Sequence, residues 1–374
     1  MMACVAVAFT IDAQQGFFAP TATSPLISDD GSVTFKVKAE GADTVRLVID
    51  SRLDTLMQRH GDGSWRLTLR DMKPDLYMYY FMIDGTKVLD DNNAQACHDV
   101  KNVMSKFILD PHGDCPMAVH DVPHGDVSAV WYDSPSLGMK RRMIVYTPAG
   151  YAEGRQRYPV LYLLHGTGGD ETVWTEQGRT AQILDNLIAS GKAEPMIVVM
   201  PNGNVDEPAA AGTGPDNNVQ PTFSHKNWMD GTFEQSFNDI VKWVDAHYRT
   251  RSSMRYRAIA GLSMGGYHSL YISANQPSDF AYVGLFSPAI SRMDQGKSTI
   301  YDDLEAKLVN QFKQRPRLYW IGIGKDDFLY KDNAAFRQML DKNRLRYTYC
   351  ESTRGHEWTN WRDYLVTFTQ LLFK

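Results

Sequence analysis

The chain has 374 residues, of which 43% are hydrophobic and 22% are charged, a globular composition that can bury a large core and excludes wholesale disorder. Its 39 lysines and arginines are outnumbered by 44 aspartates and glutamates, so no basic excess is available to neutralise a nucleic acid. No apolar run approaches the ~18 residues of a membrane-spanning helix, and the cysteines are too scattered for a disulfide-dense scaffold or a CxxC metal site.

The amino-terminal residues 1–25 differ in composition from the rest of the chain. They begin with a short apolar stretch, MMACVAVAF, and Ala13-Gln14-Gln15 then offers a small residue at which a signal peptidase could cleave. No lysine or arginine precedes the apolar stretch. We interpret residues 1–25 as the remnant of a secretory signal, which predicts a secreted or periplasmic protein; a disordered tail is the alternative.

Residues 26–115 have the pattern of a small all-β unit. Polar and apolar residues alternate along several short segments, and turns rich in aspartate and glycine separate them. The segments are residues 32–38, 44–49, 64–69 and 77–83. Short strands at this spacing predict a β-sandwich.

Within this unit, residues 75–85 (DLYMYYFMIDG) resemble the strand and turn of the immunoglobulin-like modules that precede carbohydrate-active enzymes, including the family 48 carbohydrate-binding type. The resemblance implies the fold of a carbohydrate-binding module. Trp65 and Tyr79 could form a platform for a sugar, but aromatic residues at alternating strand positions are more often part of a core. Cys97 and Cys115 are either a disulfide bridge or two free buried thiols.

Dense proline and glycine up to residue 138 indicate a linker, which we place at 116–138. From 139 to 374, apolar strands alternate with amphipathic helices, one of which carries Phe233, Phe237 and Ile240 on a single face. This alternation predicts an α/β domain with a mostly parallel sheet that is covered on both faces.

The segment 257–266 (RAIAGLSMGG) contains the strongest chemical signal, a GxSxG motif between an apolar strand and a helix. A sharp strand-to-helix turn lifts the hydroxyl of Ser263 away from the backbone, and Gly261 and Gly265 leave room where the turn crowds its neighbours. The amino terminus of the helix also favours developing negative charge. We therefore predict that Ser263 is a nucleophile rather than a structural turn residue.

A serine nucleophile needs a base, and a further group that orients the base. Two histidines follow Ser263: His268 lies inside the next helix, whereas His356 lies in a loop between the last strand and the last helix. That loop is at the carboxyl edge of the sheet, where Ser263 also lies, so His356 is the predicted base. Asp326 and Asp327 both follow the preceding strand, and either fits as the acid.

An oxyanion hole needs two backbone N–H groups. One should come from Met264, which follows the nucleophile. The other should come from the turn HGTGG at 165–169, because it follows an apolar strand and its glycines let the backbone approach a ligand; we assign it to Thr167. The same glycines make a poor phosphate cradle, because no GK[ST] follows them.

Four motifs together resemble the esterase D-type branch of the α/β-hydrolases, and within it carbohydrate esterase family one, the bacterial feruloyl and acetylxylan esterases. The motifs are LLHGTGG at 163–169, AGLSMGG at 260–266, GKDDFL at 324–329 and GHEWTNWR at 355–362. The resemblance covers residues 125–374 and implies a doubly wound α/β-hydrolase sheet. It also implies a catalytic triad of Ser263, Asp327 and His356, with Thr167 and Met264 as the oxyanion donors.

The chain departs from the family pattern at two places near the expected substrate cleft. Arg354 stands where a glycine is common, and the loop from 203 to 231 is longer than usual. Connections of that length are usually lids or binding loops. The residues that could contact the substrate are Trp174, Asn202, Trp228 and Trp358. Aromatic walls suit a flat phenolic acyl group; core packing is the alternative for the tryptophans at 174 and 358.

These observations predict a serine carboxylic-ester hydrolase that releases hydroxycinnamoyl groups, feruloyl above all, from plant cell-wall polysaccharide such as arabinoxylan. The alternatives are an acetylxylan esterase, an enterobactin-type siderophore esterase, and a glycan-binding protein with a decayed esterase domain. The intact set of Ser263, Asp327 and His356 argues against the last. The expected partner is feruloylated or acetylated xylan. No cluster of metal-ligating residues is visible, so no metal and no cofactor are expected, and the oligomeric state is left open.

Overall fold

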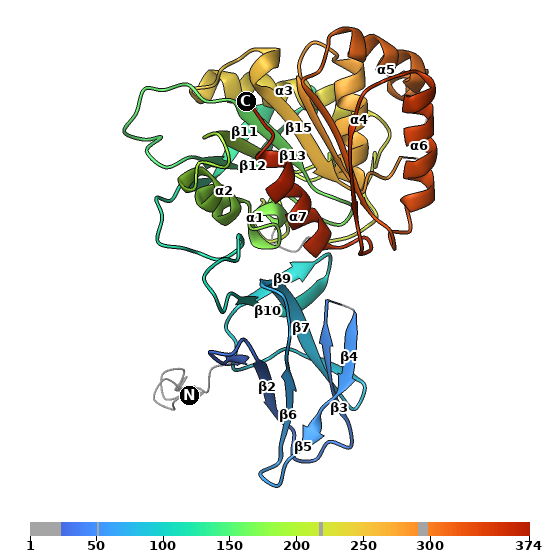
Figure 1. Cartoon of the computed structure of the whole chain (residues 1–374). Coiled ribbons are helices and arrows are strands. Elements are labelled where there is room, and N and C mark those ends of the chain that lie inside the picture. Colours follow the sequence, from blue (N-terminus) through green and yellow to red (C-terminus); the bar gives the residue numbers. More distant parts are fainter. Residues whose placement is uncertain (1–23, 51, 217–219, 291–297) are drawn as a thin grey trace, which may run out of the picture.

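The computed structural model describes residues 24–50, 52–216, 220–290 and 298–374. Figure 1 shows a smaller amino-terminal unit of strands against one end of a larger unit of sheet and helices. The secretory signal predicted for residues 1–25 falls, up to residue 23, outside the described residues. Within the described ranges, no helix is long and apolar enough to cross a membrane.

The smaller unit, residues 26–115, is called the β-unit below and is all-β, as predicted. One antiparallel sheet has the strands, in spatial order, β1 (Leu26–Ile27), β2 (Val33–Lys38), β6 (Ser64–Leu69) and β5 (Gln58–Arg59). The other has β4 (Leu53–Leu56), β3 (Val45–Ile49), β7 (Asp75–Ile83), β10 (Asn102–Leu109) and β9 (Ala96–Asp99), with β8 (Thr86–Val88) paired to β7. The polar–apolar alternation that predicted these strands matches their burial, most clearly in β2.

The core of the β-unit holds the aromatic residues that the sequence left open. Trp65 is 5% exposed and Tyr79 is fully buried, so both pack in the core and neither forms a platform for a sugar. Cys97 and Cys115 are free and buried. Burial raises the pKa of each thiol to about 11, so both stay protonated and unreactive near neutral pH.

The larger unit is built on one eight-stranded sheet, as the α/β prediction requires. Its strands, in spatial order, are β11 (Asp126–Ser134), β12 (Met139–Thr147), β14 (Ile197–Pro201), β13 (Val160–Leu164), β15 (Arg257–Leu262), β16 (Tyr282–Phe286), β17 (Leu318–Gly324) and β18 (Thr348–Ser352). β11, β12 and β14 pair antiparallel, and all later pairs are parallel. The central strands β13, β14 and β16 are buried along their whole length, because helices cover both faces.

The linker predicted at 116–138 is wrong for its second half. Residues 126–134 form β11, an edge strand that pairs with β12 along all 9 of its residues. Most of its side chains are exposed, so it lacks the buried apolar run by which the inner strands are recognised. Pro123 and Pro135 flank the strand rather than interrupt it, and proline is tolerated at such strand ends.

Helices cover both faces of this sheet (Figure 1). The described helices are α1 (Val173–Glu176), α2 (Thr180–Ala189), α3 (Thr232–His247), α4 (Met264–Asn275), α5 (Leu304–Lys313), α6 (Tyr330–Lys342) and α7 (Trp358–Thr369), with short 3₁₀ turns at Met254–Tyr256 and Thr299–Tyr301. α1, α2 and α7 share one hydrophobic cluster, and α3 to α6 share the other. The sheet therefore has two separate cores, one on each face.

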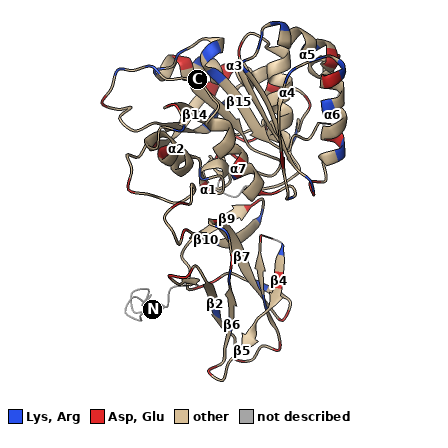
Figure 2. Cartoon of the chain, viewed as in Figure 1, with Lys and Arg blue, Asp and Glu red and all other residues tan. Residues whose placement is uncertain are grey.

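The β-unit does not stand apart from the larger unit. Its Met78 and Met104 belong to the same buried cluster as Trp174, Trp358 and Trp361 of the larger unit. Charged residues of both signs are scattered over the two units in the view of Figure 2. The two units thus share a core that the predicted linker did not anticipate.

A buried ion pair lies within this shared core. Arg362, on α7, donates to both carboxylate oxygens of Asp75, on β7, at 2.8 and 2.9 Å. Arg362 is fully buried and Asp75 is 4% exposed. Two further guanidinium N–H groups are also paired, because Nη1 donates to the Gln177 carbonyl at 3.0 Å and Nη2 donates to the Leu76 carbonyl at 2.9 Å. A buried guanidinium with this set of partners holds α1, α7 and β7 at fixed positions.

Replacing Asp75 by alanine leaves the Arg362 guanidinium buried without its carboxylate, so the free energy of unfolding should fall by about 3 kcal/mol or more. Asp54→Ala is the matched control, because it removes the carboxylate of the exposed Arg46–Asp54 pair of the same β-unit and should cost under ~1 kcal/mol. Urea denaturation of the full chain measures both losses. Two small and equal losses would contradict the expected role of Asp75.

Candidate active site

Ser263 lies between β15 and α4 in a backbone conformation that few residues adopt. Its φ is +52°, and its N–H donates to the Phe286 carbonyl at 2.9 Å. A Cβ on Gly265 would lie 2.3 Å from the Leu164 carbonyl oxygen, and one on Gly261 would lie 2.4 Å from the Gly265 backbone. Both glycines are therefore required by close backbone approach, and the turn they permit projects Ser263 from the sheet edge.

The structure brings His356 to Asp327 rather than to Asp326. Nδ1 of His356 lies 2.9 Å from Oδ2 of Asp327, and Oδ1 of the same carboxylate accepts the Leu329 N–H at 2.9 Å. Asp327 is 4% exposed, whereas Asp326 points into solvent. Because a carboxylate only accepts, Nδ1 carries the proton and Nε2 keeps a lone pair.

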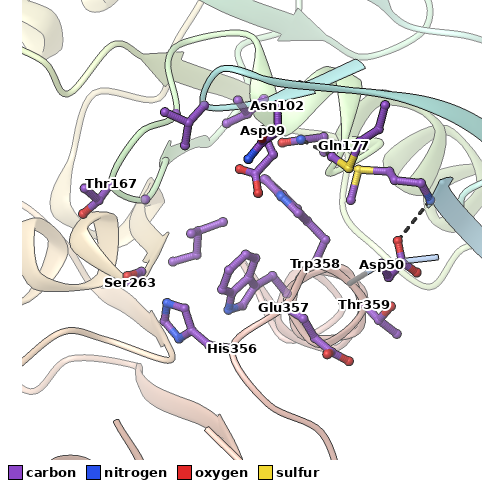
Figure 3. A pocket seen from close by; sticks show the side chains of 18 of the residues that line it. Asp50, Asp99, Asn102, Thr167, Gln177, Ser263, His356, Glu357, Trp358 and Thr359 are labelled. Atoms are coloured by element: carbon purple, nitrogen blue, oxygen red, sulfur yellow. Dashed lines mark hydrogen bonds between the residues drawn. The ribbon is translucent and has the colours of Figure 1, made fainter. Parts of the chain in front are cut away.

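Ser263 and His356 line one cavity of about 410 Å³. Figure 3 shows them with Thr167 at one end of this cavity and Asp50 and Thr359 at the other. Met264 is the first residue of α4, so its N–H is one of the donors that an α-helix cannot satisfy internally. The arrangement joins a hydroxyl, an imidazole with a free lone pair and two candidate N–H donors.

His165 holds the turn that carries Thr167, a role that the sequence analysis missed. Its Nε2 accepts the Gly203 N–H at 2.7 Å, so its Nδ1–H donates to the Gly166 carbonyl at 2.8 Å. Burial lowers the pKa of His165 to about 4, which keeps the ring neutral. The HGTGG motif contains this histidine, so its position beside the oxyanion turn could be read from the sequence. Its partner Gly203 is 38 residues away in the chain, so the hydrogen bond could not.

The four predicted substrate contacts differ in position. Trp358 lines the cavity and is 8% exposed. Trp174 is 1% exposed and packs behind it, with ring centroids 5.4 Å apart, so the core alternative holds for Trp174. Asn202 is fully buried below the site, where its Oδ1 accepts the Asn204 N–H at 2.8 Å and its carbonyl accepts from Arg141 at 3.0 Å. It supports the backbone of the loop and does not line the cavity.

The fourth residue, Trp228, belongs to the long loop from 203 to 231, which lies beside the nucleophile. Its indole N–H contacts the Met264 sulfur at 3.2 Å, and its side chain is 37% exposed. The cavity itself is lined by another residue of the loop, Phe223. Two distant parts of the loop are held together, because the His225 ring contacts the Asp206 carboxylate at 3.1 Å.

One wall of the cavity comes from the β-unit, which the sequence analysis did not expect. The β-unit side chains that line the cavity include Asp50, Met78, Tyr80, Asp99, Asn102 and Met104. Burial raises the pKa of the Asp50 carboxyl to about 6, and its Oδ1 accepts the Met78 N–H at 3.0 Å (Figure 3). No local pattern could have revealed this wall, since it forms only when distant segments pack together.

The β-unit also contacts the loop that carries His356. Arg52, between β3 and β4, forms an ion pair with Glu357, the residue after His356. A Cβ on Gly355 would lie 3.8 Å from the same guanidinium. The docked β-unit thus limits the movement of the His356 loop.

Comparison with curated proteins finds relatives that are esterases by name. The chain is 28% identical over 358 residues to an endo-1,4-beta-xylanase/feruloyl esterase of Xylanibacter ruminicola, covering 94% of this chain and 46% of that protein. It is 30% identical over 252 residues to an esterase of Mycobacterium tuberculosis, covering 65% of this chain and 50% of that protein. The chain therefore spans about half the length of these curated relatives.

Solved structures share the fold. A ferulic acid esterase, 26% identical, superposes with a TM-score of 0.56 and covers 67% of this chain and 100% of its own. The enterobactin esterase of Shigella flexneri is 17% identical, with a TM-score of 0.61, and covers 91% of this chain and 92% of its own. That second likeness concerns the fold alone, and it extends over both units.

The predicted enzyme class agrees with a comparison against protein families. The model of a family described as "Putative esterase" matches residues 134–371, more than half of the chain. This range contains Ser263, Asp327 and His356, and it begins at the last residue of the edge strand β11. The chain belongs to this esterase family of carboxylic ester hydrolases.

Proposed function

We propose that the chain hydrolyses hydroxycinnamoyl esters, feruloyl esters above all, on plant cell-wall polysaccharide such as arabinoxylan. The observation that carries the proposal is the cavity in which Ser263 and His356 meet walls from Phe223, Trp358 and Tyr80. A flat phenolic acyl group buries a large area against such walls, whereas an acetyl group gains little from them.

The chemistry follows from the positions of three side chains. His356 Nε2 takes the proton of Ser263 Oγ as that oxygen attacks the ester carbonyl, while Asp327 holds the Nδ1–H and thereby the tautomer. The imidazolium then gives its proton to the departing sugar oxygen, and an acyl–serine ester remains. Water attacks this ester with His356 again as the base, which releases the carboxylic acid and restores the serine.

The negative charge that develops on the carbonyl oxygen needs donors that are already in place. The N–H groups of Thr167 and Met264 fill this role in the proposal. The turn of Thr167 is supported from behind by the neutral His165, and Met264 is held at the start of α4. Both donors therefore have fixed positions before substrate binds.

The polysaccharide part of the proposal is supported by a relative. The Xylanibacter ruminicola protein, whose name joins a xylanase with a feruloyl esterase, aligns with 94% of this chain. A polymer of this kind is met outside the cell, in agreement with the secretory signal proposed for residues 1–25. Two antiparallel sheets around one core support an immunoglobulin-like β-unit, but binding of sugar by it would need residues other than Trp65 and Tyr79.

Hydrolysis of a substrate panel tests the function. Methyl ferulate should be cleaved with a higher kcat/KM than methyl acetate, which has the same leaving group. The comparison with 4-nitrophenyl acetate must be corrected for the better leaving group of that ester. Ser263→Ala and His356→Ala should each lower kcat by about 10³-fold or more, because the three groups act as a unit. A preference for acetyl esters or for a catecholate lactone, or near-normal turnover by either variant, would reject the proposal.

The two adjacent aspartates provide an internal control. Asp327→Asn should lower kcat by about 10³-fold or more, because an amide can present its N–H₂ to Nδ1 and favour the wrong tautomer. Asp326→Asn changes an exposed side chain one residue away and should change kcat less than about twofold. Steady-state kinetics on methyl ferulate compare the two, and the reverse order would show that the acid is misassigned.

The buried His165 predicts how stability changes with pH. Its folded pKa, about 4, lies below the ~6.5 of an exposed histidine, so between these values the unfolded chain binds a proton that the folded chain does not. Lowering the pH from 7 to 5 should therefore cost about 2 kcal/mol of unfolding free energy through this residue. His165→Gln keeps an acceptor for the Gly203 N–H without titrating. Urea denaturation at both pH values should show a smaller loss in this variant, and an unchanged loss would contradict the assignment.

A further inference from the structure

The catalytic cavity crosses the boundary between the two units. At its catalytic end, the hairpin of β9 and β10 reaches the turn that carries Thr167: a Cβ on Gly168 would lie 2.5 Å from Val100 Cγ2 and 2.8 Å from Phe223 Cε1. The hairpin tip, the glycine turn and the long loop therefore meet at one point. The cavity is complete only with the β-unit in place.

The opposite end of the cavity has a buried wall. Met78, Met104, Gln177 and Arg362, which line the cavity, are 6%, 7%, 1% and 0% exposed, whereas Lys87 at its rim is exposed. Figure 3 places Asp50 and Gln177 away from Ser263, toward this end. A polysaccharide cannot continue through a buried wall, but a single acyl group can end there. This end therefore suits the acyl side of an ester rather than its sugar side.

Gln177 carries an unpaired acceptor within the wall of this end. Its Nε2 donates to the His98 carbonyl of β9 at 2.8 Å and contacts the Met78 sulfur of β7 at 3.8 Å. A carbonyl can only accept, so the amino group must face His98, and this fixes the orientation of the amide. Its Oε1 is buried without a hydrogen-bond partner among the described residues, on a side chain that lines the cavity.

A second polar atom of the cavity lining is also unused. The indole N–H of Trp361 is buried and has no partner within the described ranges. Buried polar groups are normally hydrogen-bonded, so an acceptor and a donor left unpaired in one cavity indicate a ligand with polar substituents. Around them, Met78, Met104 and Trp358 supply apolar surface, and methionine adapts its shape to a ring.

We propose that the β-unit completes the acyl pocket: it forms a wall of the cavity opposite Ser263 and holds Gln177 so that Oε1 accepts the phenolic hydroxyl of the acyl group. This inference rests on the hydroxycinnamoyl esterase activity proposed above and assigns its acyl specificity to the contact between the two units. An acyl group that lacks the hydroxyl leaves the buried amide oxygen unpaired. That loss corresponds to about tenfold in kcat/KM.

The wild-type full chain provides the first test. Methyl 4-hydroxycinnamate should be hydrolysed with a kcat/KM about tenfold higher than methyl 4-methoxycinnamate, which has no phenolic hydrogen. A ratio near one, with both esters cleaved faster than methyl acetate, overturns the pocket assignment and leaves the proposed function standing. Failure to cleave either cinnamate overturns both proposals.

Single substitutions test whether Gln177 causes the difference in kcat/KM between the two cinnamate esters. Gln177→Met removes the acceptor at nearly constant volume and should bring the ratio of the two esters close to one. Gln311→Met is the matched control, because Gln311 is also 1% exposed with an unpartnered amide oxygen in the described chain, but lies on α5 outside the cavity. It should leave the ratio unchanged. An unchanged ratio in Gln177→Met overturns the role of Oε1.

A substitution on the β-unit tests the wall itself and does not depend on how Gln177→Met folds. Met104→Trp, on β10, fills the end away from Ser263, so kcat/KM for methyl 4-hydroxycinnamate should fall at least about tenfold more than for methyl acetate. Circular dichroism confirms that the variant is folded. Equal effects on the two esters would show that the acyl group does not reach the β-unit, and would overturn the proposal.

Discussion

The buried pair of Arg362 and Asp75 is the interaction on which the rest of the site depends. Arg362 lies on α7, the helix that begins at Trp358, directly after the loop that carries His356. A buried guanidinium is tolerated only when it is paired and hydrogen-bonded, and here its partners come from β7 and from the end of α1. The position of the proposed base is therefore set by the contact between the two units as well as by the sheet.

The same network explains why Gln177 lies in the cavity wall in a defined orientation. Its carbonyl accepts from Arg362, which holds its backbone, and its side-chain amino group donates to the His98 carbonyl. One residue thus connects the ion pair to the wall of the cavity. A polar group held at both ends has little freedom to relax, so only a ligand that donates to its oxygen gains this hydrogen bond.

The sequence was sufficient where the structure is local. The strand, turn and helix around Ser263 follow from apolar periodicity and two glycines, and the two candidate acids and the proposed base follow from their positions after β17 and β18. It was insufficient where contacts are long-range: Asp75 and Arg362 are 287 residues apart, and neither is unusual in its own segment. Trp174 and Trp358 illustrate the limit, since both are aromatic residues near motif turns, yet only the second lines the cavity. Likewise, β11 was taken for a linker because an exposed edge strand has no buried apolar run.

The groups proposed to react and the walls proposed to hold the acyl group come from different parts of the chain. The groups proposed to carry out the chemistry project from the carboxyl edge of one buried sheet, whose strands hold them to fixed positions. The walls that meet the acyl group come from α7, from the loop containing Phe223 and from the β9–β10 hairpin, which are independent of one another in sequence. Changes in those walls leave the elbow at Ser263 untouched, because its close backbone contacts are made at Gly261 and Gly265 within the larger unit. Acyl specificity can therefore vary among members of the family while the hydrolytic apparatus stays the same.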